Sequence, residues 1–132
     1  MIKNRESILS HLREEAKKIR VNIWRALHAA GSGHIGGSLS AADILAALYF
    51  HYMKIQHGDP EWPNRDRFIL SKGHANAALG AVLVQAGFIS RDILEQFYGF
   101  ESLFGMHPDI KLPGVEMSTG GLGHGLSIGL GV

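Results

Sequence analysis

Apolar residues recur every three or four positions through the first thirty residues of the chain. Charged residues occupy most positions between them, and the apolar series consists of Ile8, Leu12, Ala16, Ile19, Ile23 and Leu27. This spacing places the apolar side chains on one face of a helix and leaves the opposite face to solvent. The pattern predicts an amphipathic helix that ends near Ala30, with Gly31 as its stop signal.

A second helical pattern follows a glycine-rich stretch. Ser40 has the hydroxyl of a capping residue, and Asp43 stands where a carboxylate reaches back in a capping box. These signals predict a helix from Ala41 to about Met53. The next segment, residues 56–64, contains one glycine and two prolines and is predicted to be a loop.

The short apolar run from Arg67 to Leu70 predicts a buried strand. It leads through Ser71-Lys72-Gly73 into an alanine-rich helix that should extend from about His74 to Ala86. A strand that enters a helix through a glycine-containing turn is how α/β proteins present N–H groups to phosphates. The predicted fold class is therefore α/β, rich in helix in this segment, with a short buried parallel strand.

The last third of the chain has a different character. Ser90 should cap a short helix that ends near Phe97, and prolines make the segment 101–114 irregular. No charged residue follows Glu116, and apolar residues lie there among glycines, which predicts a closely packed, buried helix. Because its apolar pattern reaches Val132 without a cap, we expect another segment or chain to cover it, in a homo- or hetero-oligomer.

Composition excludes several classes of function. The 132 residues have the length of one domain, and 45% hydrophobic and 19% charged residues are ordinary for a globular protein. A formal net charge of +1 gives no reason to expect nucleic acid or a membrane surface, and no apolar run approaches the roughly 20 residues that span a bilayer. The absence of cysteine excludes disulfides and is compatible with the cytoplasm.

Three histidines stand in frames of small residues. They are His34 between Gly33 and Gly37, His74 after Gly73, and His107 after Gly105, and a glycine-dense run from 120 to 131 follows them. Glycine lets backbone N–H groups approach a ligand closely, so these segments predict a site for an anionic cofactor that several loops assemble. The spacing of residues 31–36 also matches a dinucleotide fingerprint, but a helix precedes it where that fingerprint requires a strand.

The order and wording of these segments resemble the N-terminal section of transketolases, which use thiamine diphosphate to move a two-carbon ketol unit between sugar phosphates. Many single-chain members have proline where Ile35 and Gly121 stand, and glutamine where His124 stands. The residues at these three positions are more similar to those of members whose two halves are separate polypeptides. The resemblance extends from about Ala29 to Val132, and its carriers are Ser32-Gly33-His34, the stretch from Gly36 to Leu45, the stretch from Asp66 to His74, and Gly114-Val115-Glu116 leading into Ser118 to Gly123.

This resemblance implies roles for individual residues. His34 corresponds to a histidine beside the reactive thiazolium and the sugar hydroxyls, where an imidazole with a pKa near 6.5 can exchange protons. His107 corresponds to a histidine that bonds the donor sugar, and His74 to a contact of the cofactor diphosphate. Purely structural roles remain open for each, as does an approach of His124 to the cofactor. Gly120, Gly121 and Leu122 correspond to the family segment that contacts the cofactor rings.

The resemblance also implies parts that lie outside this chain. In the family, a Gly-Asp-Gly segment and an asparagine hold Mg²⁺ or Ca²⁺ against the diphosphate, and a glutamate from another domain activates the aminopyrimidine. Residues 1–132 contain no Gly-Asp-Gly segment and no metal ligands of this kind, so we expect a single, incomplete thiamine-diphosphate-binding domain.

The expected function is ketol transfer between sugar phosphates in carbohydrate metabolism, such as the pentose phosphate pathway, and the expected partner is a C-terminal transketolase section or subunit. Two alternatives are a segment of an enzyme like 1-deoxyxylulose-5-phosphate synthase and a non-catalytic remnant that serves only as a subunit-interaction module. The residues from Leu70 to His74 argue against the synthase.

Overall fold

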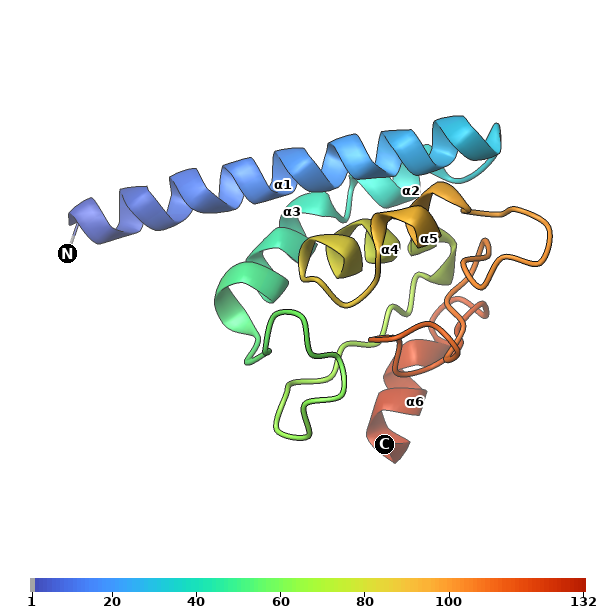
Figure 1. Ribbon diagram of the computed structural model, residues 1–132. Helices are drawn as coiled ribbons and strands as arrows, with labels where there is room; N and C mark the ends of the chain where they lie inside the picture. Colours follow the sequence, from blue (N-terminus) through green and yellow to red (C-terminus); the bar gives the residue numbers. More distant parts are fainter. Residues whose placement is uncertain (1) are drawn as a thin grey trace.

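The long amphipathic helix predicted at the N-terminus is present. The structure is a computed structural model that describes residues 2–132, and side chains from residue 4 onward. Helix α1 spans Ile2–Ala30 and is followed by Gly31, whose φ of 60° is accessible to glycine without strain. Figure 1 shows α1 lying across the other helices, against which it buries the face of Ala16, Ile19 and Ile23. Both the helix and its end near Ala30 are confirmed.

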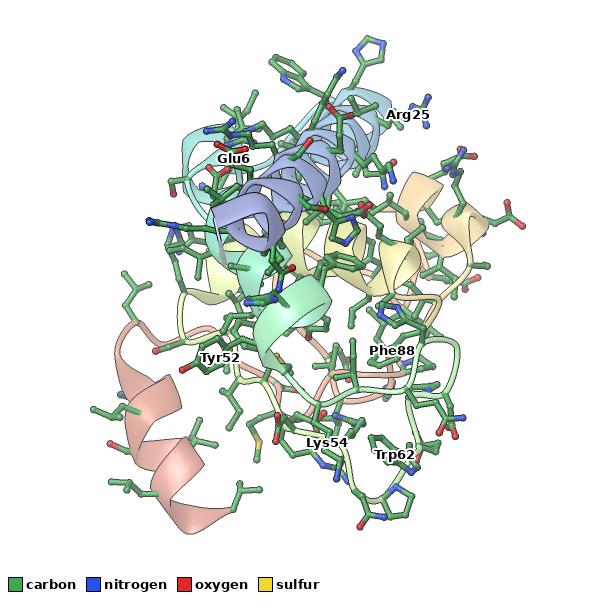
Figure 2. The ribbon with its side chains drawn as sticks, turned by 90° about the vertical axis from the view of Figure 1, so that its left-hand side faces the viewer. Glu6, Arg25, Tyr52, Lys54, Trp62 and Phe88 are labelled. Atoms are coloured by element: carbon green, nitrogen blue, oxygen red, sulfur yellow. The ribbon has the colours of Figure 1, made fainter. Side chains whose placement is uncertain are left out.

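The second predicted helix is present in two pieces, and a separate short helix precedes it. Helix α2 spans Ile35–Leu39 and helix α3 spans Ala42–Ala47, which continues into a π-helical turn, η1, at Leu48–Tyr52. The prediction located the helical segment but missed both the break before Ala42 and the earlier helix α2. Beyond η1, residues 53–66 contain no helix, as predicted for the loop, and the Lys54 ammonium lies 5.3 Å from the centre of the Trp62 ring (Figure 2).

The predicted capping box is wrong. Ser40 lies at the C-terminal end of α2, where its hydroxyl donates a hydrogen bond to the carbonyl of Gly37 at 3.1 Å. Asp43 pairs with Arg20 of α1 and does not reach back to the helix start. Both residue types are typical of a helix N-terminus. Here, however, Ser40 bonds to the last turn of α2 and Asp43 pairs with α1, so neither side chain caps α3.

The alanine-rich helix forms the centre of the molecule. A 3₁₀ turn, η2 at Gly73–Ala75, leads into helix α4 at Asn76–Gln85, as the sequence predicts apart from the tighter first turn. Helix α4 contacts α1, α3 and the short helix α5, which spans Arg91–Glu95. Ser90 is the N-cap residue of α5 but makes no side-chain capping bond. Every residue of α4 from 76 to 83 is buried, so small side chains let three neighbours approach it.

Gly80 in α4 permits one of the closest contacts in this core. A Cβ atom at this position would lie 2.0 Å from Cζ of Phe104, whose side chain is fully buried. Gly80→Ala gains about 1 kcal/mol of helix propensity but overpacks the core at a typical cost of about 1–3 kcal/mol. We therefore expect thermal unfolding at a lower temperature.

The matched control for Gly80 is Gly129→Ala, another helical glycine, whose Cβ would make only an ordinary 3.7 Å contact. This replacement should leave the unfolding temperature unchanged or raise it. An increase for Gly80→Ala of the same size as for the control would show that Phe104 moves aside freely.

The short strand is not observed in the part of the chain that the structure describes. Residues 66–70 are neither helix nor strand. A strand requires a neighbouring strand for its backbone hydrogen bonds, and here the carbonyl of Leu70 accepts a bond from the Thr119 hydroxyl at 2.7 Å. The described residues therefore do not show the predicted strand, because an apolar run can predict burial but cannot supply the neighbouring strand that a sheet needs.

The C-terminal helix is also placed differently from the prediction. Helix α6 spans His124–Gly131 and extends from the body of the molecule (Figure 1). Leu126 is 76% exposed and Leu130 is 85% exposed, whereas Gly125 is the buried residue of this helix. The helix is confirmed and its burial is not, because within residues 2–132 nothing covers its apolar side chains. None of the described helices is long and apolar enough to cross a membrane.

Candidate functional site

Two of the three glycine-framed histidines lie side by side. His34 directly precedes α2 and is exposed, while His74 lies in the η2 turn and is half-buried. Their ring centroids are 5.2 Å apart, and the rings meet edge to face at 76°. The fold therefore brings together two histidines that are forty positions apart in the sequence.

Gly37 explains how close this approach can be. A Cβ at this position would lie 3.0 Å from Cδ2 and Nε2 of the His74 ring, which is tighter than nearly all real contacts of a Cβ. The Lys72 ammonium donates a hydrogen bond to the Ser40 hydroxyl at 3.0 Å. This bond anchors a positive charge to the residue that follows α2, three positions after Gly37.

The loop that contains Gly120 packs directly on the turn before His74. A Cβ on Gly73 would lie 2.9 Å from the carbonyl oxygen of Thr119, so only glycine allows this contact. The ideal Cβ position of Gly120 lies 3.7 Å from Cδ2 of His107, which places the third glycine-framed histidine beside this loop. The four segments singled out in the sequence therefore form one cluster.

Asn76 holds the loop of His107 against α4. Its amide Nδ2 donates a hydrogen bond to the carbonyl of Gly105 at 2.8 Å, and the residue is 1% exposed. Its Oδ1 is buried without a hydrogen-bond partner among the described residues. The sequence analysis missed Asn76, although an amide inside an alanine-rich helix is a signal that could have found it.

The segment from Gly121 to Gly125 completes the surface. The backbone N–H of Gly125 donates to the Ser71 hydroxyl at 3.2 Å, which fixes the start of α6 beside the η2 turn. Leu122 is 69% exposed, and Gly121 lies against the ring of His124, whose Nδ1 would be 3.0 Å from a Cβ. Ser71, like Asn76, had no assigned role in the sequence analysis.

A buried cluster of charges lies behind this loop. Glu116 pairs with Arg65, and the two side chains are 10% and 5% exposed. The second oxygen of Glu116 accepts a bond from Nη1 of Arg67 at 2.9 Å. Burial, and then the negative charge of Glu116, raises the pKa of Tyr49 far above its ordinary value, so its hydroxyl stays protonated. The cluster anchors the chain two residues before Ser118.

The site fits a cofactor that carries a diphosphate and flat rings. The side chains named around it are imidazoles, hydroxyls, an amide and an ammonium, and none is a carboxylate that would repel phosphate. Leu122 offers an apolar side chain that the chain itself leaves uncovered. Three cavities in the described part of the chain have walls that do not include His34, His74 or His107. Across residues 2–132, no group of three or more acidic or histidine side chains could hold a metal ion.

Comparisons with known proteins agree with this geometry. Residues 12–132 match the family described as "Transketolase, thiamine diphosphate binding domain". The chain is 43% identical over 118 residues to one subunit of apulose-4-phosphate transketolase from Phocaeicola vulgatus, covering 89% of this chain and 42% of that protein. It is 40% identical over 122 residues to 6-deoxy-6-sulfo-D-fructose transketolase subunit SqwG from a Clostridium species, covering 92% and 44%.

Solved structures give the same result. The fold matches transketolase from Leishmania mexicana with a TM-score of 0.85 and 35% identity, over 91% of this chain and 18% of that one. A complex of Pichia stipitis transketolase with sedoheptulose 7-phosphate matches with a TM-score of 0.82, also at 35% identity, over 92% and 18%. The chain thus spans less than half the length of these relatives. It belongs to the transketolase family, within the thiamine diphosphate binding domain.

Proposed function

We propose that this chain forms the diphosphate-binding part of a transketolase that transfers a two-carbon ketol unit between sugar phosphates. The observation that supports this most directly is the cluster itself. His34 and His74 lie 5.2 Å apart at their ring centres, and His107 lies beside Gly120. The four segments that carry the sequence resemblance thus share one surface, as a common ligand requires.

Each residue has a definite task in this proposal. Thiamine diphosphate, when bound, supplies a nucleophilic thiazolium carbon. His74, with the Lys72 charge nearby, holds the diphosphate, while Gly120 and Gly121 present their backbone to the aminopyrimidine and Leu122 supports the rings. His34 and His107 bond the sugar and exchange protons with its oxygens, because an imidazole ring can both donate and accept a proton. Asn76 keeps the His107 loop in place.

Further segments must complete the site. We infer that residues 1–132 are one incomplete domain, and that the Mg²⁺ or Ca²⁺ ligands and the pyrimidine-binding domain come from a C-terminal transketolase section or subunit. Two relatives whose names describe them as subunits support this arrangement. The exposed apolar residues of α6 would pack against the added segments, and residues 67–70 would find a strand partner there. The assembly would be a homo- or hetero-oligomer acting in cytoplasmic carbohydrate metabolism.

The test separates the chain from the completed enzyme. The purified chain alone should show no ketol transfer from a ketose phosphate to an aldose phosphate, and calorimetry should detect weak or no binding of thiamine diphosphate with Mg²⁺. Diphosphate without a fixed cation is poorly held, so adding the metal-binding and pyrimidine-binding segments should restore both. Turnover by the chain alone would contradict the proposal that its site is incomplete. A fully assembled complex without ketol transfer would instead favour the alternative that the chain is a non-catalytic module for subunit interaction.

A further inference from the structure

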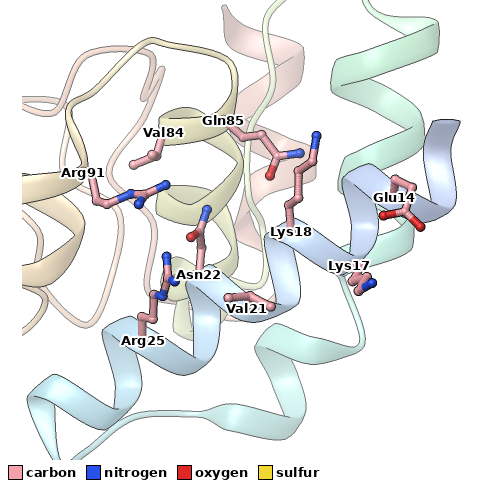
Figure 3. A pocket seen from close by; sticks show the side chains of 9 residues that line it. All are labelled: Glu14, Lys17, Lys18, Val21, Asn22, Arg25, Val84, Gln85 and Arg91. Carbon is pink, nitrogen blue, oxygen red and sulfur yellow. The ribbon is translucent and has the colours of Figure 1, made fainter.

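A cavity lies at the opposite end of α4 from the glycine-framed histidines. It has a volume of about 420 Å³ and lies between α1, the end of α4 and the start of α5 (Figure 3). Its wall includes Val84 and Gln85 at the C-terminal end of α4, whereas His74 precedes the N-terminal end of that helix. Ten helical residues rise about 15 Å, so the two sites are separate. The volume falls in the usual range of about 300–1,000 Å³ for small-molecule sites.

The walls of this cavity are strongly basic. Four cationic side chains and one acidic side chain line it, namely Lys17, Lys18, Arg25, Arg91 and Glu14. Figure 3 shows Arg25 of α1 and Arg91 of α5 pointing toward Asn22, while Lys17 and Glu14 lie farther along α1. Lys18 is already neutralised, because its ammonium donates to Glu15 at 2.8 Å. Among the described residues, Arg25, Arg91 and Lys17 are the lining cations without an ion pair, and the two arginines are the ones that point toward Asn22.

Neither arginine has a partner of its own. Among the described residues, no carboxylate lies within 4 Å of Arg25 or Arg91, and neither guanidinium donates a hydrogen bond. Arg25 and Arg91 line one cavity from separate helices, and an anion between two like charges would offset their repulsion. Asn22, which is 6% exposed, adds an amide at the same point.

We propose that this cavity binds a small phosphorylated molecule. The guanidinium groups of Arg25 and Arg91 grip the phosphate, since their planar, forked donors match phosphate oxygens in pairs. The Asn22 amide donates a further bond from the floor of the cavity. The uncharged remainder of the ligand lies along Val21, Val84 and Gln85, which supply an apolar wall and one amide.

The test is a titration of the ¹⁵N-labelled chain, free of thiamine diphosphate and divalent cations, with inorganic phosphate and separately with glycerol 3-phosphate. Saturable shifts should appear at the arginine side-chain N–H groups of Arg25 and Arg91. The double variant Arg25→Gln/Arg91→Gln should raise the dissociation constant at least about tenfold, because two charge-assisted contacts are lost. Both residues are exposed, so the fold should survive, and the amide spectrum checks this.

Arg13→Gln is the matched control. It removes the same charge from an exposed position of the same helix, outside the cavity, and should leave the dissociation constant unchanged. Tighter binding of glycerol 3-phosphate would identify an organic phosphate as the ligand, and equal binding would identify free phosphate. The measured shifts belong to Arg25 and Arg91, which have no role in the proposed ketol transfer, so the two proposals can fail separately. An equal loss in Arg13→Gln, or no saturation at millimolar concentrations, would overturn the proposal.

Discussion

Replacing Glu116 by alanine is expected to lower the free energy of unfolding by about 3–5 kcal/mol, the usual loss when one partner of a buried ion pair is removed. The reason is the environment of Arg65, whose side chain is 5% exposed and whose charge Glu116 balances. Without the carboxylate, that charge stays buried and unpaired. Urea unfolding, followed by the fluorescence of Trp24 and Trp62, measures the change.

Two variants make this result specific. Arg67→Gln removes only the half-exposed partner of Glu116 and should cost about 0–1 kcal/mol. The double variant Arg65→Met/Glu116→Leu replaces the pair by apolar side chains and should recover most of the lost stability, because neither charge is then stranded. A loss in Glu116→Ala no larger than in Arg67→Gln would mean that solvent or another group already compensates Arg65.

In a completed enzyme, His107→Ala and His74→Ala should fail in different ways. His107→Ala should reduce turnover roughly ten- to a hundredfold, because a hydrogen bond to a group that is charged or becomes charged contributes about 1.5–3 kcal/mol. Its affinity for the cofactor should barely change. His74→Ala should instead raise the cofactor concentration needed for half of full activity, with near-normal turnover at saturation.

Titration of thiamine diphosphate against the rate of ketol transfer distinguishes the two variants. His28→Ala is the control, because His28 is an exposed residue near the end of α1 that has no role in the proposed site. It should match the unaltered enzyme in both quantities. A defect in His107→Ala that excess cofactor rescues, or a defect in His74→Ala that ignores the cofactor concentration, would mean that the two assignments are exchanged.

The sequence predicted best those features that depend on local pattern. The period of apolar residues located α1, and the alanine run located α4, because each pattern reflects which side chains face the core. The sequence also nominated His34, His74, His107 and Gly120 separately, and the fold placed them on one surface. Their individual roles stay predictions.

The features that could not be predicted depend on partners distant in the sequence. Ser40 is a residue type that commonly caps helices, but its hydroxyl bonds to the carbonyl of Gly37, and Asp43 forms an ion pair with Arg20. The role of Asn76 depends on the carbonyl of Gly105, which only the folded chain brings near. Likewise, a pattern can mark residues 67–70 as buried without showing which backbone would pair with them.

The burial of α4 has a consequence for synthesis of the chain. Helix α1 leaves the ribosome before α3 and α4, with its apolar face uncovered. Neither can be fully covered until α4, which contacts both, has emerged. At the usual synthesis rate of about 5–20 residues per second, the nascent chain exposes this face for several seconds. The folding of the first half of the chain is therefore timed by the arrival of the central helix.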